Sequence, residues 1–266
     1  MIRSIVLSLV CLFALAGTAS AQFFLEEGKV VLAVSAGDRI NKSLTVHNTT
    51  GESVQVKVYW EDFEYQAPYD GNKVFLPAGM GAASASQWFN FSPREFTLPA
   101  FGKQVIDYTV SAPQELQGGY YGVLFFEKSN DPLRDGTGVN IVTRVGCLFF
   151  FEARDKVKTA AIDGIKISAN ALSGNFINQG NVVLISKATY YVMDNEGMIA
   201  DRGEAKALYV PPGATASWEI ALPPGLNAGN YTLVLNADLG EGDVVVKEIE
   251  LMSDGAGGIT IGDVRD

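Results

Sequence analysis

Alternation of apolar and polar residues is the dominant pattern of this chain. In the clearest example, residues 54–60, one face carries Val54, Val56, Val58 and Trp60, and the residues between them are Gln, Lys and Tyr. A period of two predicts a half-buried antiparallel strand. Other short apolar runs follow at spacings of roughly 8 to 14 residues, separated by Gly, Pro, Asn or Asp, and none keeps a helical period. The pattern therefore predicts an all-β protein.

One series of signals occurs twice along the chain. An alternating run ends at a proline, and a Gly-x-Tyr then opens a new apolar strand. The first copy has Pro113 and Gly118-x-Tyr120, and the second has Pro223-Pro224 and Gly229-x-Tyr231. A repeated order of strand signals predicts two copies of one β-sandwich module.

The order of these signals predicts the domain limits. Residues 1–21 have the charge, the short apolar core and the Ala-Ser-Ala end of a cleaved signal peptide. We expect a first immunoglobulin-like β-sandwich over residues 22–153 and a second over residues 154–252. Residues 253–266 are rich in Gly and Asp and are expected to form a flexible tail. The predicted fold is thus two tandem immunoglobulin-like domains after the signal peptide.

Tyr120 and Tyr231 are expected to be structural corner residues. A tyrosine near the start of strand F of immunoglobulin-like domains uses its hydroxyl to fix the adjacent corner. We regard this role as better supported by the sequence than ligand binding at either tyrosine.

Charge and cysteine content narrow the range of partners. Without Arg3, which lies in the signal peptide, the formal net charge of −10 becomes −11. This charge argues against nucleic acid or an anionic membrane surface as partner. After the signal peptide no apolar run is long enough to span a membrane. Cys147 is then the only cysteine, which excludes an intramolecular disulfide and predicts a small core residue.

Candidate chemistry is sparse, so we expect no enzyme, no metal and no cofactor. His47 is the only histidine, and with Cys147 it cannot supply a usual zinc site. Glu61, Asp62 and Glu64 could imitate a carboxylate-based hydrolase, but a solvated strand end is the simpler interpretation. Two acidic turns, 194–197 and 238–243, are compatible with weak calcium binding or with ordinary hairpins.

The first domain resembles the N-terminal domain of periplasmic pilus-assembly chaperones. The resemblance rests on the strand end at 46–48, the strand 54–60, the segment 91–98, Pro113 and the run 141–150, and it covers residues 29–154. The second domain is more similar to immunoglobulin-like repeats of bacterial exported proteins. This resemblance implies that a long last strand of domain one is lent to a protein partner, with Val139, Ile141, Arg144 and Val145 as its contacts.

The chain also departs from that family. Its members hold the partner's terminal carboxylate with an Arg on the first strand and a Lys near the end of the lent strand. Here the first strand has no Arg, and the Lys position falls near Gly146 or Cys147.

The sequence leaves three hypotheses for the function. The leading hypothesis is a non-enzymatic exported protein, periplasmic or extracellular, that binds exported or surface proteins by strand pairing. The alternative is a structural spacer or adhesion module of the cell wall or surface, and a carboxylate-based hydrolase comes third. An open strand edge would favour the first, and a covered edge with nearly linear domains the second.

Overall fold

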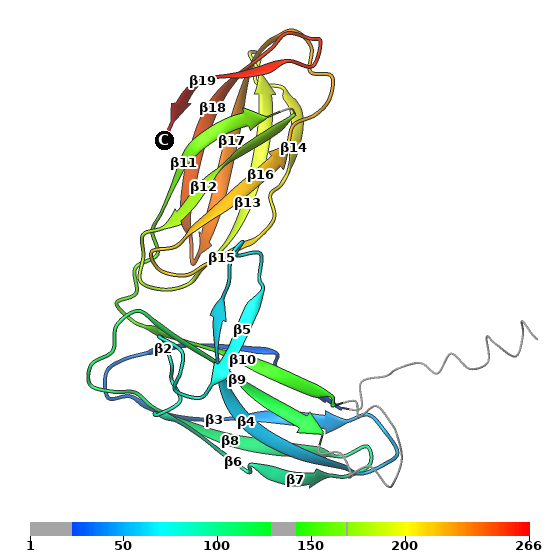
Figure 1. Cartoon of the computed structure of the whole chain (residues 1–266), viewed down its shortest axis with the longest axis vertical. Coiled ribbons are helices and arrows are strands. Elements are labelled where there is room, and N and C mark those ends of the chain that lie inside the picture. Colours follow the sequence, from blue (N-terminus) through cyan, green and yellow to red (C-terminus); the bar gives the residue numbers. More distant parts are fainter. Residues whose placement is uncertain (1–22, 129–141, 169) are drawn as a thin grey trace, which may run out of the picture.

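The computed structural model describes residues 23–128, 142–168 and 170–266. Over these ranges the regular structure consists of β-strands only. Figure 1 shows two separate β-sandwiches, one built from β1–β10 and the other from β11–β19. This architecture confirms the all-β, two-sandwich fold predicted from the sequence.

The first domain consists of two facing sheets. The four-stranded sheet has the order β1 (Phe23–Leu25), β3 (Arg39–Asn48), β8 (Lys103–Ser111) and β6 (Phe89–Ser92). The other has the order β2 (Lys29–Val34), β10 (Arg144–Ala153), β9 (Gly119–Lys128), β4 (Val54–Tyr65) and β5 (Lys73–Pro77), and β7 (Glu95–Leu98) also pairs with β4. The β2–β10 pair is parallel, whereas β10 and β9 are antiparallel.

Aromatic side chains fill the space between these two sheets. Trp60 of β4 is 8% exposed, as its position on the apolar face of residues 54–60 predicted. Its ring centroid lies 4.4 Å from that of Phe89 and 5.7 Å from that of Phe149. Such pairs add specific ring contacts to the burial of apolar area. The core of this domain therefore needs no disulfide, and Cys147 lies buried within it.

The second domain is a similar sandwich with a smaller sheet. The three-stranded sheet has the order β11 (Ala160–Ser168), β12 (Ala171–Asn178) and β16 (Thr215–Ala221). The opposite sheet has the order β14 (Ile199–Glu204), β13 (Leu184–Asp194), β17 (Gly229–Gly240), β18 (Asp243–Ser253) and β19 (Ile259–Arg265), with β15 (Leu208–Val210) beside β13.

The segment expected to be a flexible tail contains the last strand, so this expectation is wrong. β19 pairs antiparallel with β18, and Ile259 and Ile261 pack against the core of the domain. The Gly- and Asp-rich residues before it form the hairpin turn, in which the Asp254 carboxylate accepts hydrogen bonds from the amides of Ala256 and Gly258. The composition that suggested flexibility is the composition of a tight turn.

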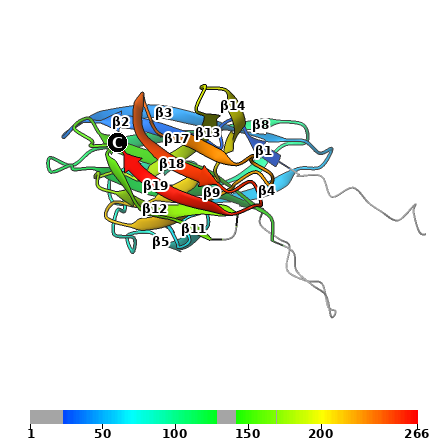
Figure 2. The same ribbon diagram turned by 90° about the horizontal axis from the view of Figure 1, so that it is seen from above.

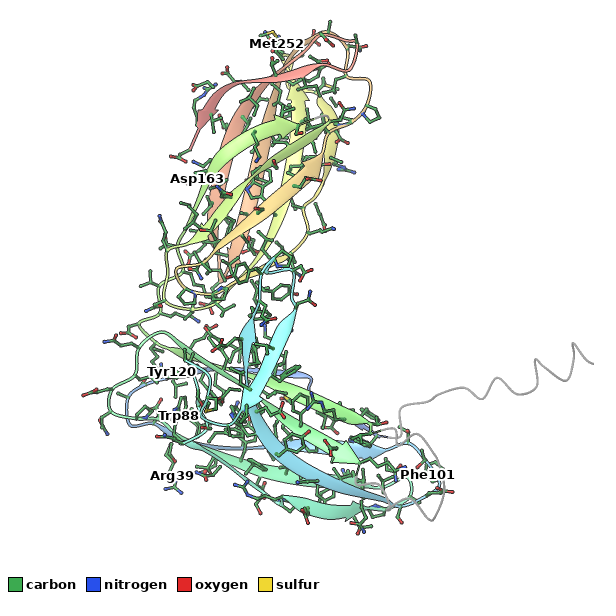
Figure 3. The ribbon with its side chains drawn as sticks, in the orientation of Figure 1. Arg39, Trp88, Phe101, Tyr120, Asp163 and Met252 are labelled. Carbon is green, nitrogen blue, oxygen red and sulfur yellow. The ribbon has the colours of Figure 1, made fainter. Side chains whose placement is uncertain are left out.

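The two domains meet at an angle rather than in line (Figure 1). Seen along the long axis, they overlap in projection (Figure 2). Phe101 and Met252 mark opposite ends of the molecule (Figure 3). The hairpin formed by β4 and β5 reaches from the first domain toward β15 of the second (Figure 1). Here the amide of Tyr209 donates a hydrogen bond to the carbonyl of Tyr69 at 2.8 Å.

Candidate functional site: the open edge of β10 and the cleft between the domains

The first half of β10 has an open edge. On this strand the amide of Leu148 donates to the carbonyl of Gly28, so Leu148 faces β2. Just before the strand, the carbonyl of Thr143 accepts from the amide of Lys128 at the end of β9. Successive residues of a strand point their backbone groups to opposite sides. Arg144 and Gly146 therefore direct their amide and carbonyl groups away from β9. Because β2 pairs only from Leu148 onward, no described residue bonds them.

Four residues of this strand were predicted as partner contacts. Val139 and Ile141 lie outside the described residues. Arg144 and Val145 are neighbours on β10, and their side chains lie on opposite faces of the sheet. Val145 is partly buried and packs against the core of the first domain. The Arg144 side chain lies on the outer face and is 39% exposed.

Arg144 covers an aromatic surface on the outer face of the sheet. Its guanidinium lies 4.1 Å from the ring centroid of Phe125 and 3.5 Å from the carboxylate of Glu61. It also donates a hydrogen bond of 3.3 Å to the hydroxyl of Tyr59. This hydrogen bond is the main cause that raises the pKa of Arg144. A cation over an aromatic face, partly desolvated, is a stable arrangement that a partner can also use.

The same outer face continues into a third hydrophobic cluster that both domains share. It contains Phe63, Tyr121, Val123, Phe125 and Phe150 from the first domain and Val183 from the second. Ile185 and Tyr209 of the second domain pack against it. A sheet that is apolar on both faces needs a cover on each. Here the second domain supplies part of the second cover.

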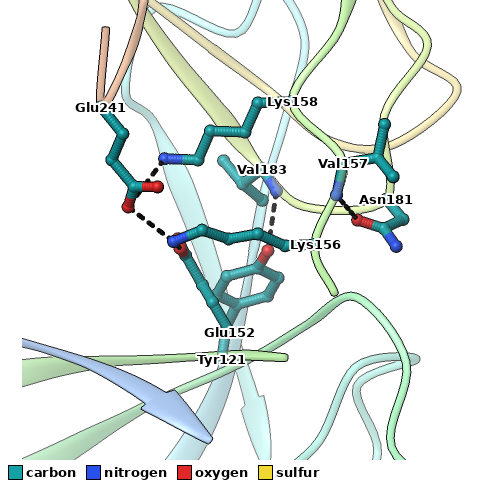
Figure 4. A network of polar contacts seen from close by, with 8 residues as sticks. All are labelled: Tyr121, Glu152, Lys156, Val157, Lys158, Asn181, Val183 and Glu241. Atoms are coloured by element: carbon teal, nitrogen blue, oxygen red, sulfur yellow. Dashed lines mark hydrogen bonds and ion pairs between the residues drawn. The ribbon is translucent and has the colours of Figure 1, made fainter. Parts of the chain in front are cut away.

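Polar contacts fix the junction of the two domains. The Val183 amide donates a hydrogen bond of 2.7 Å to the hydroxyl of Tyr121 (Figure 4). Burial raises the pKa of Tyr121, so this hydroxyl stays protonated. Gly118 is in the left-handed region, and a Cβ there would lie 2.2 Å from the carbonyl oxygen of Asn181. The repeated Gly-x-Tyr start thus lies directly against the other domain in its first copy.

Lys156 connects carboxylates of both domains. Its Nζ lies 2.6 Å from Glu152 of β10 and 2.5 Å from Glu241, and Lys158 lies 3.5 Å from Glu241 (Figure 4). Burial alone would lower the pKa of Lys156, but its hydrogen bonds to the two carboxylates outweigh burial and raise it. The same hydrogen bond from Lys156 is the main cause that lowers the pKa of Glu241.

A cavity of about 220 Å³ opens between the domains beside these residues. Its lining includes Lys29 and Phe150 of the first domain and Val183 and Leu239 of the second. The Lys29 ammonium lies 4.5 Å from the Phe150 ring centroid and, among the described residues, has no carboxylate at ion-pair distance. Burial lowers the pKa of Lys29, and the nearby Lys158 acts in the same direction while Glu152 opposes it. Sequence reasoning missed Lys29, because only the pairing of β2 with β10 brings it to the cleft.

The two corner tyrosines differ in their contacts. The Tyr231 hydroxyl donates to the carbonyl of Asn227 at 3.1 Å, a bond back to the preceding corner. Tyr120 packs edge-on against Trp88, with 5.4 Å between ring centroids. Of the described residues, none hydrogen-bonds the Tyr120 hydroxyl. In this copy the following residue, Tyr121, makes the bond, and it does so across to the second domain.

The acidic residues that could imitate an active site have structural partners. Asp62 is 1% exposed and accepts hydrogen bonds from Trp60 Nε1, Ser84 Oγ and the amides of Gly79 and Gly81. Glu64 accepts from the amide of Ala82 at 3.1 Å. Asp62 thus holds the loop that follows β5.

The histidine and the possible metal ligands lie as follows in the described residues. His47 lies 2.6 Å from Glu26. Across residues 23–128, 142–168 and 170–266, no group of three His, Cys, Asp or Glu side chains could hold a metal ion. The same residues contain no helix long and apolar enough to cross a membrane.

Comparison with known proteins identifies the fold. No family model matches the chain, and no curated protein matches it. The class 5 fimbriae chaperone CfaA is similar in structure, with a TM-score of 0.50 and 15% identity over 84% of this chain and 97% of that chain. A chaperone–tip adhesin complex of CFA/I fimbriae biogenesis gives a TM-score of 0.49 and 15% identity, covering 91% and 98% of the two chains. The resemblance predicted from the sequence is therefore confirmed at the level of the two-domain fold.

Proposed function

We propose that the protein is a non-enzymatic, chaperone-like protein of the exported compartment. It binds an exported or surface protein, and the binding element is the open edge of β10 beside the interdomain cleft. The observation that supports this most directly is the outward backbone of Arg144 and Gly146, which an incoming strand can pair. In this proposal Val139 and Ile141 continue the same edge, and residues 1–21 are the export signal.

The position of β2 shows where a partner strand parallel to β10 would end. Among the described residues, no strand pairs with the outer edge of β10 at residues 144–147, and the parallel strand β2, which begins at Lys29, occupies this edge from Leu148 onward. A partner strand that runs parallel to β10 at the vacant part would point its C-terminal end at Lys29. We propose that Lys29 binds a carboxylate there, the role the resemblance implied for an Arg on the first strand.

Two features of the structure weigh against the spacer alternative. The domains meet at an angle, and they share a hydrophobic cluster instead of being joined by a free linker. A spacer that extends reach is better served by domains in line.

Val145 also changes the test of the leading function. Because Val145 packs inward, a charged substitution there would disturb the core and would not report on partner binding.

A proline substitution tests the proposed strand pairing. Arg144→Pro removes an outward amide hydrogen without removing a bond to β9, whereas Arg144→Ala removes the same side chain and keeps the amide. We expect Arg144→Pro to reduce capture of the partner from an envelope extract by at least about tenfold, the effect of one lost hydrogen bond to a buried group. Arg144→Ala should retain most of the capture. Equal capture by both variants would rule out pairing at this edge.

A charge substitution tests the proposed anchor. Lys29→Met keeps the apolar stem and removes the ammonium, so we expect weaker partner capture with an unchanged melting temperature. Lys103→Met, on the exposed face of the other sheet, is the matched control and should bind normally. If Lys29→Met captures the partner as well as the control does, Lys29 is not the anchor, even if strand pairing stands.

A further inference from the structure

The second domain lacks a strand that the first domain has. In the first domain β6 lies beside β8, so the sheet has the order β1-β3-β8-β6. In the second domain the equivalent sheet stops at β16, because β15 pairs with β13 of the opposite sheet. No strand of the described ranges therefore occupies the position that corresponds to β6.

Two asparagines establish which residues of β8 in the first domain are equivalent to residues of β16 in the second. The Asn48 amide bonds the carbonyl of Gly102 before β8, and the Asn178 amide bonds the carbonyl of Ala214 before β16. Asp107, five residues beyond Gly102, corresponds to Glu219, and Thr109 corresponds to Ala221. Asp107 and Thr109 pair with Ser92 and Asn90 of β6. Glu219 and Ala221 pair with no described strand on that side.

The backbone of β16 is oriented for such a partner. Ala214 and Leu222 direct their backbone groups toward the β12 side, because their bonds go to Asn178 and Asn170. The residues of the other parity, Thr215, Ser217, Glu219 and Ala221, direct theirs outward. Within the described ranges no backbone or side-chain group bonds them. This gives four consecutive outward amide and carbonyl pairs.

Space lies beside this edge. A cavity of about 690 Å³ has Ser217 and Glu219 on one side and Lys206 and Leu208 on another, and it continues over the outer face of β11 and β12. One buried hydrogen-bond donor next to the edge is also unpaired: Trp218 Nε1 has no hydrogen-bond partner among the described residues. The corresponding place in the first domain is filled by Phe89 and Phe91 of β6, both buried.

We infer that the edge of β16 is a second strand-pairing site, and that it takes an extended segment of a partner protein. The segment runs antiparallel to β16 and has an apolar residue at every second position, because β6, which fills the equivalent place, has both properties. This site lies on the second domain and is independent of the proposed β10 edge. A free edge of this kind is a template for pairing unless it is blocked.

Amide hydrogen exchange on the full mature chain tests this inference. The probe is a synthetic peptide with the sequence of residues 88–92, Trp-Phe-Asn-Phe-Ser, used at millimolar concentration. In the free protein the amides of Ser217, Glu219 and Ala221 should exchange freely, whereas those of Trp218 and Ile220 should be protected. The peptide should slow exchange at Ser217 and Glu219 by about tenfold or more, the effect of one added hydrogen bond.

A pair of variants at one position supplies the control. Glu219→Pro removes an outward amide and should abolish the peptide's effect, whereas Glu219→Ala keeps the amide and should preserve it. If Glu219→Pro does not fold, the exchange pattern of the unmodified chain decides alone. The inference fails if the peptide adds no protection. It also fails if the outward amides are already protected without peptide. Protection at every protein concentration would mean that the chain covers its own edge, and protection only at high protein concentration would mean that a second copy covers it.

Discussion

At the scale of single residues, two buried asparagines do equivalent work in the two domains. Asn48 is 4% exposed and donates to the carbonyls of Glu52 and Pro99, while Asn178 is 1% exposed and donates to those of Val182 and Val210. Each side-chain carbonyl accepts an amide two residues on. Buried side-chain amides are kept only where their hydrogen bonds are made, so each asparagine links three segments at one end of its sandwich.

Replacing Asn178 with Ala should destabilise the second domain. The carbonyls of Val182 and Val210 would stay buried without donors, which costs about 1 to 3 kcal/mol per unsatisfied group. We expect a lower urea midpoint for unfolding of this domain and little change in the first. Asn175→Ala, which removes a surface bond to Asp163, is the control and should change stability by less than about 1 kcal/mol. Equal effects of the two substitutions would contradict the role given to Asn178.

The prediction that Cys147 is a small core residue is confirmed. It is completely buried, and burial raises the pKa of its thiol to about 12. The thiol therefore stays protonated at neutral pH and is a poor nucleophile. An apolar strand around a lone cysteine predicted this outcome.

At the scale of elements, the burial of strands with strong alternation was predictable. For strands buried on both faces, the sequence did not predict what covers the second face. The alternating run 54–60 became β4, which extends to Tyr65. In β9 every side chain from Tyr121 to Phe126 is buried, so the strand has no polar face. A continuous apolar run indicates burial on both sides but does not name what covers the second side.

Removal of β19 tests how much this strand, which the composition did not predict, contributes to stability. A chain ending at Ser253 would lose the ladder to β18 and the packing of Ile259 and Ile261, which we expect to cost on the order of 2 kcal/mol from two partly buried side chains. A chain ending at Val264 loses Arg265 and Asp266, with the ion pairs to Glu250, Asp263 and Lys247 and the last pair of the ladder, but keeps Ile259 and Ile261, so it should retain nearly full stability. Equal urea midpoints for the two truncated chains would show that β19 contributes nothing to the fold.

At the scale of the whole molecule, the angle between the domains is set by contacts from distant parts of the chain. Tyr121 bonds Val183, the hairpin residue Tyr69 bonds Tyr209, and the Tyr65 and Tyr209 rings stack at 5.1 Å. These contacts hold the open edge of β10 and the cleft in one arrangement. A site that is already arranged loses less entropy when a partner binds.

The ion pairs at this junction predict a dependence of the junction on pH. The pKa of Glu241 is lowered from its ordinary value of 4.5 by Lys156. A lowered pKa means that the contribution is present above the ordinary value and is lost as the pH falls through the lowered one. We therefore expect the protection factor of the Val183 amide, its exchange rate relative to an unstructured amide at the same pH, to fall below about pH 4.5, while the core of each domain stays protected. Lys156→Met should show fast exchange at neutral pH already, and an acid transition unchanged by this substitution would contradict the prediction.

Sequence alone determined most of the strands, though not β19, together with their approximate order and the existence of two sandwiches, because period-two alternation and repeated Pro and Gly-x-Tyr signals are local properties. It also indicated the family whose fold the chain shares. Only the tertiary structure decided which strand edges stay open, that Val145 faces the core while Arg144 faces outward, and that Lys29 reaches the cleft. The reason is physical: edges, cavities and shared hydrophobic clusters depend on which segments pair across long separations, and the local pattern of a strand does not specify its neighbours.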